Sequence, residues 1–390
     1  MMSILRLLGY MVLSCLVWVV ISQYFFCPQF IFADPKPFSG NNIYNPYASF
    51  DSNKWVKCNF HAHSNAWSGI TNGHGSSKDI HQAYDSLGYG IFSVSDYQKI
   101  NKAGIENTNY ISAYEHGFGL EKTHQLVLGD SAVCWTEFLL PQTLSNKQYI
   151  LNRLSVNKSN VITLNHPAMR NGYTPEDLKY LSGYHCIEVL NPCVVSLAHW
   201  DTALSNGKPV FITGNDDLHN VFKEKRLGSM CTWVNVSIAN KGSVLEALKK
   251  GKSYGMITGQ AKKLPVLKKL TLVNDTLNVE VDKKAARIII SGQNGKILNT
   301  FDDTHSMKYG IRSSDSYVRV RLDFDSGTSV FLNPLFRQNS KTFINSTPKQ
   351  NKVKSIVLRV AGCFILFLWL FFLYIKLIKN PAAKRNIKAI

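Results

Sequence analysis

Histidines and carboxylates recur beside short apolar runs along this chain. The first pair, His61 and His63, follows the run at 56–60, with one residue between the two imidazoles. Alternate residues of an extended segment point the same way, so both rings can face one metal ion. Four further candidate ligands lie beside other apolar runs, and Glu115 precedes them in the chain: His124, His166, Asp217 and His219. Imidazole and carboxylate groups together bind zinc, manganese or iron, so the pattern predicts a metal centre.

A pair of divalent ions at such a centre would suit the hydrolysis of a phosphate ester. Two ions about 3.5 to 4 Å apart lower the pKa of a water between them and neutralise phosphate oxygens during an in-line displacement. We therefore interpret Glu115 and Asp217 as catalytic as well as metal-binding. Arg170, four residues after His166, is a candidate clamp for the substrate phosphate. An ordinary exposed loop arginine is the alternative at that position.

The elements that must position these residues alternate between strands and helices. Apolar runs typical of buried strands occupy 56–60, 91–94, 125–128, 161–164 and 210–213. Helices are predicted at 79–87, from 174 to Gly183, and from a capping box at 243–246 to Gly251. Strands that alternate with helices favour a parallel sheet, and polar residues gathered at strand ends favour closure into a barrel.

The order of these segments resembles the PHP (polymerase and histidinol phosphatase) superfamily of metal-dependent phosphoesterases over about residues 55 to 225. The matching segments are NFHAH at 59–63, SVSDY at 93–97, YEHG at 114–117, HQLVLG at 124–129, LNHP at 164–167, IEVLN at 187–191 and GNDDLH at 214–219. The resemblance implies a distorted (β/α)7 TIM-like barrel. The α/β fold class predicted here is that barrel, followed by a small antiparallel β-sandwich and flanked by two transmembrane helices.

The resemblance also implies roles for the ligands. His61, His63 and Asp217 would hold one divalent ion, either zinc, manganese or iron. Glu115 would bridge to a second ion that His124 and His166 complete. Trinuclear members hold a third ion with three histidines, and His219 matches one of them. Tyr97 replaces the second, and 67–70 contains no histidine that could match the remaining one.

Two divalent ions are therefore expected as cofactors. The alternatives for the missing third-site ligands are Asp96, Tyr97 and His74. Asp96, Tyr97 and Asp216 are also expected near the ions, where they would orient ligands or water through hydrogen bonds. Asp217 is preferred to Asp216 as the ligand, because the family spacing is Asp-x-His.

The remainder of the chain divides by composition. After about residue 264, short alternating runs separated by turns such as Asn274-Asp275 predict the β-sandwich, which is similar to a small β domain in one branch of the superfamily. The predicted organisation is an N-terminal transmembrane signal-anchor at 1–30, the barrel at 31–263, the sandwich at 264–337, a linker at 338–355, a transmembrane helix at 356–378 and a basic cytoplasmic tail at 379–390.

Both ends of the chain carry apolar runs, 4–26 and 356–378, long enough to cross a hydrocarbon layer of about 30 Å. The first could instead be a cleaved secretory signal. Lysines and arginines after the second run favour a cytoplasmic C-terminus, so the domain between the runs is expected on the extracytoplasmic side, in a periplasm or at the outer face. The net charge of +18 suits anionic lipid or phosphate, and no nucleic-acid partner is inferred, because the lysines are not interleaved with aromatic residues.

The function predicted from these features is a membrane-anchored phosphoesterase that acts on a phosphomonoester or phosphodiester. One alternative is a degenerate relative that binds metal as a scaffold without catalysis. Another is a metal-dependent hydrolase of a non-phosphate bond. The complete ligand sets for two ions favour an enzyme. Cys186 and Cys193 are predicted either to form a disulfide or to remain free thiols.

Overall fold

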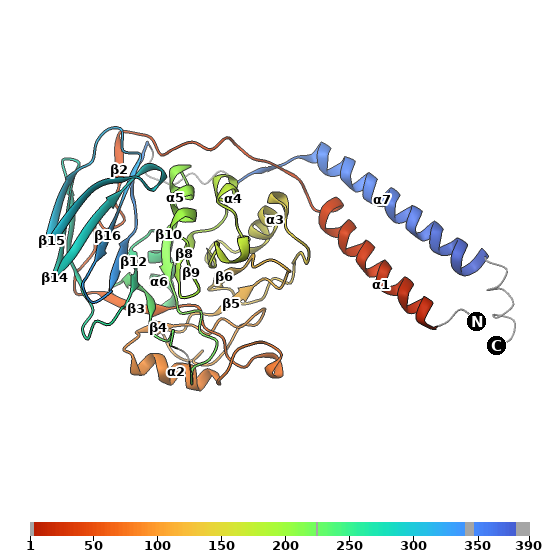
Figure 1. Cartoon of the computed structure of the whole chain (residues 1–390), viewed down its shortest axis with the longest axis horizontal. Coiled ribbons are helices and arrows are strands. Elements are labelled where there is room, and N and C mark those ends of the chain that lie inside the picture. The colour runs from red at the N-terminus through yellow and green to blue at the C-terminus, as the bar shows by residue number, and fades with distance from the viewer. Residues whose placement is uncertain (1–3, 224, 340–346, 380–390) are drawn as a thin grey trace.

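The computed structural model describes residues 4–223, 225–339 and 347–379 and shows a globular body from which two long helices extend side by side (Figure 1). The helices are α1 (Ile4–Val20), α2 (Ser77–Ser86), α3 (Leu144–Leu154), α4 (Pro175–Tyr180), α5 (Leu197–Ser205), α6 (Lys241–Lys249) and α7 (Lys352–Tyr374). The globular body is of mixed α/β class.

A first sheet has the strand order β10-β8-β7-β6-β5, with β9 paired to β8. Its strands are β5 (Ala113–His116), β6 (Gln125–Leu128), β7 (Val161–Leu164), β8 (Cys186–Asn191), β9 (Val194–Val195) and β10 (Phe211–Gly214). Strands β7, β8 and β10 are parallel, whereas β6 runs antiparallel to both β5 and β7. The prediction of a parallel sheet is therefore correct only in part, because the short segment between β5 and β6 holds no helix and turns the chain back.

The second sheet has the order β13-β14-β16-β17-β12-β11-β3-β4. Its path contains β3 (Trp55–Asn59), β4 (Ile91–Phe92), β11 (Met230–Asn235), β12 (Ser253–Ile257), β13 (Leu267–Val273), β14 (Thr276–Ser291), β16 (Tyr317–Asp323) and β17 (Ser329–Leu332). Beside it, β15 (Ile297–Gly310) pairs with β14, and β18 (Leu335–Gln338) joins β16 to β2 (Asn42–Tyr44). The sheet thus crosses residue 264 without a break.

The predicted closed barrel is not confirmed among the described residues. Strand β3 pairs with β11 and not with β10, and β11 in turn pairs with β12, so the strands form two sheets. Isolated parallel bridges join the sheets at one edge, between Tyr97 and Glu115 and between Ala62 and Leu218. The sheets therefore meet beside the candidate ligands without full ladders between them.

Side-chain caps fix where several helices begin. Ser76, Thr143 and Thr174 each accept a hydrogen bond from the backbone N–H three residues later, in capping boxes that start α2, α3 and α4. The predicted start of the third helix at Ser243 is wrong. Helix α6 begins earlier, because the side chain of Asn240 accepts the hydrogen bond from the Ser243 N–H.

The alternating strands predicted after residue 264 are present and antiparallel. Asn274 and Asp275 join β13 to β14 with φ of 51° and 57°, the left-handed backbone that a tight hairpin turn requires. None of the eight cysteines forms a disulfide, so Cys186 and Cys193 are free thiols, the first buried and the second exposed.

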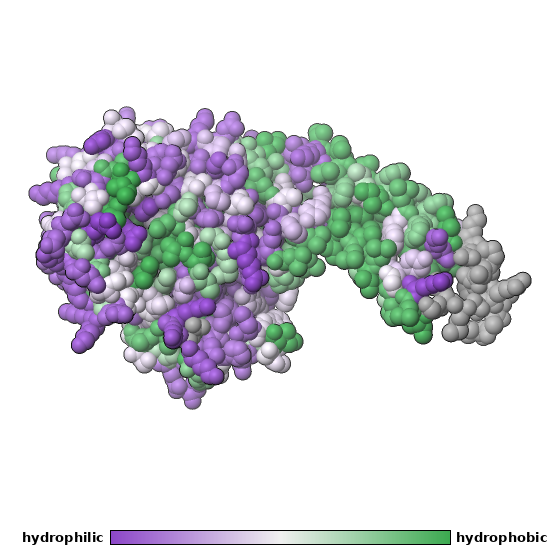
Figure 2. Space-filling model, in the orientation of Figure 1, coloured by the Kyte–Doolittle hydropathy of each residue, from purple (hydrophilic) through white to green (hydrophobic). Residues whose placement is uncertain are grey.

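Two helical segments, Ile4–Phe25 and Lys352–Leu377, are long and apolar enough to cross a membrane. Only 6% of the most apolar window of each is buried, so neither is a core helix of the globular body. The hydrophobic surface of the two helices stands out from the body in Figure 2. Trp369 donates from Nε1 to Ser14 Oγ at 3.1 Å, and β1 (Phe30–Ile31) pairs with β19 (Lys349–Gln350) at the helix bases. The helices therefore form an antiparallel pair.

The membrane orientation gives a first testable prediction. Of the basic tail that motivates it, at 379–390, residues 380–390 lie outside the described residues. A reporter fused after Ile390 should behave as cytoplasmic, and the same reporter inserted near Asn339 should behave as extracytoplasmic. Paired phosphatase and fluorescent-protein fusions measure both positions, and the reverse pair of results would place the globular body in the cytoplasm.

Candidate metal centre

The seven candidate ligands converge at one edge of the two sheets. His61 and His63 follow β3, Glu115 lies within β5, His166 follows β7, and Asp217 and His219 follow β10. The reversed direction of β6 explains why His124 joins them, since it precedes its strand and so lies at the edge where the neighbouring strands end. All are buried except His219, whose side chain is 20% exposed. The predicted set is therefore brought together in full.

Glu115 lies between two groups of imidazoles, and each of its oxygens faces a different group. Oε2 lies 3.3 Å from His61 Nε2 and 3.2 Å from His63 Nε2. Oε1 lies 2.9 Å from His124 Nδ1 and 3.3 Å from His166 Nε2. One carboxylate in this position can contribute an oxygen to each of two adjacent cations.

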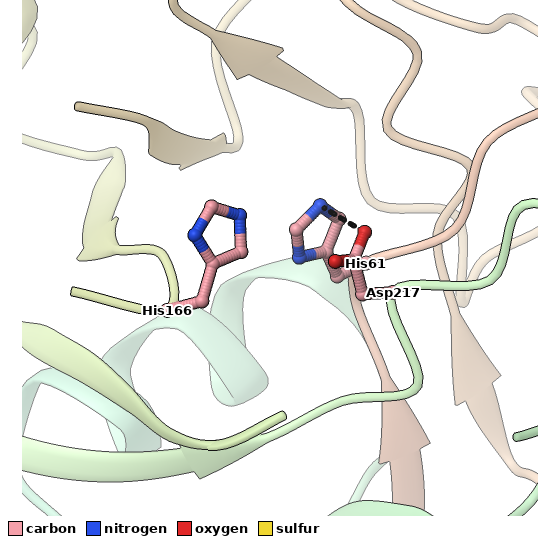
Figure 3. A group of neighbouring side chains, drawn as sticks. All are labelled: His61, His166 and Asp217. Atoms are coloured by element: carbon pink, nitrogen blue, oxygen red, sulfur yellow. Dashed lines mark ion pairs between the residues drawn. The ribbon is translucent and has the colours of Figure 1, made fainter. Parts of the chain in front are cut away.

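The first donor group consists of His61, His63, Glu115 and Asp217. Asp217 Oδ1 lies 3.2 Å from His61 Nε2 and 3.5 Å from His63 Nε2, and the two Nε2 atoms are 3.1 Å apart. Ligand atoms about 2.0 to 2.1 Å from a tetrahedral ion are about 3.3 Å from one another. Figure 3 shows the ion pair of His61 with Asp217.

Two acceptor atoms in this group have no hydrogen bond, although both are buried. They are Glu115 Oε2 and Asp217 Oδ1. A buried carboxylate oxygen without a donor is costly, and either a proton on a neighbouring imidazole or a cation would satisfy it. The donor spacing and these two oxygens fit a divalent cation.

The second donor group consists of Glu115, His124 and His166, whose ligand atoms lie within 4.8 Å of one another. Asn165 Nδ2 donates to Glu115 Oε1 at 2.9 Å and so helps to fix the carboxylate. The ring of His166 faces His61 across the site (Figure 3), with centroids 5.8 Å apart. A second cation beside the first would have three protein ligands here, which leaves room for water or substrate.

Burial and mutual attraction set the charges in the cluster. Burial opposes ionisation of Glu115 and Asp217, but the imidazoles, with His124 and His61 foremost, outweigh it and hold the pKa of both carboxyl groups well below the usual range. Burial likewise opposes protonation of His61, yet the nearby carboxylates raise the pKa of its ring. The carboxylates are therefore anionic and require positive charge beside them, which protons or metal ions can supply.

Two ligands have backbone conformations that side chains rarely adopt. His166 has φ of 30° and Asp217 has φ of 45°. Left-handed backbone at a residue other than glycine costs about 1 to 3 kcal/mol and is concentrated at functional sites. Here it directs both side chains into the cluster as the chain leaves β7 and β10.

Glu188 orients the first donor group, a role that the sequence reasoning left open. Its Oε1 accepts from His61 Nδ1 at 2.9 Å and from Asn215 Nδ2 at 2.9 Å. With Nδ1 as donor, the lone pair of His61 Nε2 points toward the donor group. Asn191 Nδ2 donates to both Glu188 Oε2 and Asp217 Oδ2, at 3.0 and 3.2 Å. The segments 187–191 and 214–219 contain these residues, but only their contacts reveal the role.

The three predicted neighbours of the ligands have different positions. Asp96 accepts from the N–H and hydroxyl of Ser64 and from Asn101, so it anchors the segment after His63. The Tyr97 ring stacks on the His63 ring, with centroids 4.5 Å apart. Burial raises the pKa of the Tyr97 phenol, which therefore stays neutral. Asp216 accepts from Tyr84 and from the N–H groups of 228 and 230, which holds the loop after β10, and burial raises its pKa to about 6.

Two other candidates do not join the cluster. Arg170 is exposed at φ of 48° in the turn after His166, so its role as a phosphate clamp stays a prediction. His74 is exposed as well, and the carboxylate of Asp96 is taken up by Ser64 and Asn101. The third set in the structure therefore comprises His63, Asp217 and His219, of which the first two already belong to the first donor group.

The donor groups predict the metal content of the protein. The purified full chain should bind close to two transition-metal ions, because the first and second donor groups share only Glu115. The other two sets take most or all of their residues from these groups: His63, Asp217 and His219, and His61, His166 and Asp217. Elemental analysis after gel filtration measures the ratio of metal to chain. Three tightly held ions, or none, would contradict the prediction.

No family model matches the sequence, and no curated protein matches it. Two solved structures are similar at low identity. One is a two-domain protein from Bacteroides vulgatus ATCC 8482 containing a predicted PHP-like metal-dependent phosphoesterase, with 13% identity over 79% of this chain and 92% of that chain and a TM-score of 0.40. The other is PsfC from Pseudomonas syringae PB-5123, with 12% identity over 53% of this chain and 93% of that chain and a TM-score of 0.35. At these scores neither likeness assigns a family or an activity to this chain.

Proposed function

We propose that this chain is a membrane-anchored, metal-dependent phosphoesterase that hydrolyses a phosphomonoester or phosphodiester. The observation that supports it most strongly is the buried Glu115 carboxylate, whose two oxygens face separate imidazole groups. Two divalent ions bound there would supply water activation and neutralise charge on the phosphate.

Residues of this chain would bind the ions, orient the ligands and donate hydrogen bonds. His61, His63, Asp217 and Glu115 would hold one ion, and Glu115, His124 and His166 the other. Glu188 keeps the His61 ring in the orientation that directs Nε2 inward. The neutral Tyr97 hydroxyl can donate a hydrogen bond at the same edge. Burial of the cluster excludes bulk water, which strengthens every electrostatic interaction within it.

The same placement supports a relationship to the PHP superfamily. In this proposal residues 31–263 form an open barrel of the PHP type, because among the described strands β4 does not pair with β5 and β10 does not pair with β3. Residues 264–337 form the small β domain. The ligand order along the chain and the convergence at one edge support it.

The two apolar helices support the membrane anchor. Their exposed apolar side chains would be costly in water and favourable in lipid. In this proposal α1 and α7 cross the membrane as a pair, and the globular body lies on the extracytoplasmic side.

Substitution of two residues tests the mechanism and separates an enzyme from a metal-binding scaffold. Glu115→Gln removes the negative charge shared by both donor groups, so kcat/KM for a phosphate ester should fall more than about 100-fold, beyond the range usual for outer-shell changes. His219→Ala should cost about tenfold or less, because both donor groups stay complete without it. Rates with manganese or zinc are compared at matched protein and metal content.

Glu246→Gln on α6 is the matched control, since it makes the same chemical change at an exposed glutamate that pairs with Lys250 at the end of this helix. It should leave the rate unchanged. Equal losses of kcat/KM in Glu115→Gln and His219→Ala would mean that the set of His63, Asp217 and His219 also takes part in catalysis. A wild-type chain that binds metal but hydrolyses no phosphate ester would favour the scaffold.

A further inference from the structure

A strip of exposed apolar side chains lies on the segments that flank the metal centre. We call it the apolar strip, and it consists of Trp67, Phe118, Leu120, Trp135 and Leu139. These side chains are between 40% and 72% exposed. Exposed tryptophans and leucines on neighbouring segments are unusual on a surface that meets only water and typically mark a binding site.

One end of the apolar strip lies next to the metal centre. Trp67 donates from Nε1 to the Tyr97 carbonyl at 2.8 Å, and the Tyr97 ring stacks on the ligand His63. Trp135 packs edge-on against Trp67 with centroids 6.2 Å apart. Trp67 thus contacts the residue whose ring stacks on the candidate ligand His63, and Trp135 lies beyond Trp67.

The other end leads to the base of the membrane-spanning helices. The Leu120 N–H donates to the Leu139 carbonyl at 2.9 Å, which holds the two segments of the strip together. The next carbonyls, of Leu140 and Pro141, accept from Gln23 Nε2 at 2.8 and 3.0 Å. Gln23 belongs to the turn Ile21–Phe25 that continues α1. In Figure 2 the hydrophobic surface of the helices reaches the globular body.

Two lysines lie beside the end of the apolar strip that is nearest the metal centre. Lys99 Nζ lies 5.8 Å from the Trp67 ring centroid, and Lys122 Nζ lies 6.0 Å from that of Tyr97. Positive charge beside the metal centre and apolar surface toward the membrane suit a molecule with an anionic head and a hydrocarbon tail. Indole rings are the side chains most often found where apolar and aqueous phases meet.

We propose that the apolar strip binds the hydrocarbon chain of an amphiphilic phosphate ester while its phosphate reaches the metal centre. This rests on the proposed phosphoesterase activity and assigns its substrate class. In the reaction, water oxygen bonds to phosphorus, the bond from phosphorus to the ester oxygen breaks, and that oxygen takes a proton to leave as an alcohol. The strip takes no part in bond making and contributes affinity for the chain.

The test uses the full chain in phosphatidylcholine nanodiscs with manganese. The substrates are alkyl phosphates of two to eight carbons, all monomeric in water, together with phosphatidic acid in the disc. Each buried methylene contributes about 0.8 kcal/mol, so kcat/KM should rise at least about tenfold from ethyl to octyl phosphate with partial burial. The double variant Trp135→Ser, Leu120→Ser should reduce this ratio to about threefold or less.

The double variant Ile238→Ser, Val273→Ser is the matched control, because both residues are exposed and apolar but lie away from the strip, and it should keep the wild-type ratio. A wild-type rate that is independent of chain length, or a ratio unchanged in the strip variant, would overturn the inference while the phosphoesterase stands. If the strip variant lost activity toward phosphatidic acid alone, the inference would be overturned as well, since the strip would then only contact the lipid surface. If the wild type hydrolysed neither these monoesters nor the matching dialkyl phosphodiesters, the result would instead refute the proposed activity itself.

Discussion

The site depends on one constraint: a carboxylate buried between two groups of imidazoles must keep both of its oxygens next to positive charge. Glu115 meets it from within β5, with one oxygen toward His61 and His63 and the other toward His124 and His166. Loops from both sheets must reach that carboxylate, and the isolated bridges of Tyr97 with Glu115 and of Ala62 with Leu218 hold them there. Even the reversal of β6 follows this arrangement, since it brings His124 to the edge where its neighbours end.

Burying so many ionisable groups is unfavourable unless each is paired. The fold meets this cost with a layer of amide and carboxylate side chains behind the ligands, of which Glu188, Asn191 and Asn165 are the clearest. Strained backbone at His166 and Asp217 adds to the cost. The apolar core lies mainly within the strands and beneath the helices, although Ala62 and Leu218 belong to it and lie between candidate ligands. Most of the stability therefore resides in other parts of the same elements, so changes to the candidate ligands can alter the site and leave the fold intact.

The convergence of the seven candidate ligands could be predicted, because all but Glu115 stand beside an apolar run and a short-range pattern such as His61-x-His63 requires no knowledge of tertiary structure. The helices at 79–87 and 174–183 were also predictable from their caps and stops, to within a few residues. Sheet pairing was not, because whether β3 meets β10 or β11 depends on contacts between residues far apart in sequence. For the same reason the role of Glu188 could not be assigned, and Arg170 as a substrate clamp stays a prediction. Asp216 and Asp217 are adjacent and chemically alike, yet φ of 45° at Asp217 directs only that carboxylate to the ligands.

The central claim, that Glu115 is shared by two cations, is tested most directly by anomalous diffraction from crystals of the full chain grown with manganese or zinc. The account predicts two peaks at the metal edge, one among His61, His63 and Asp217 and the other between His124 and His166, with one oxygen of Glu115 toward each. A single peak away from Glu115, or two peaks that both contact the same oxygen while the other accepts only hydrogen bonds, would contradict it.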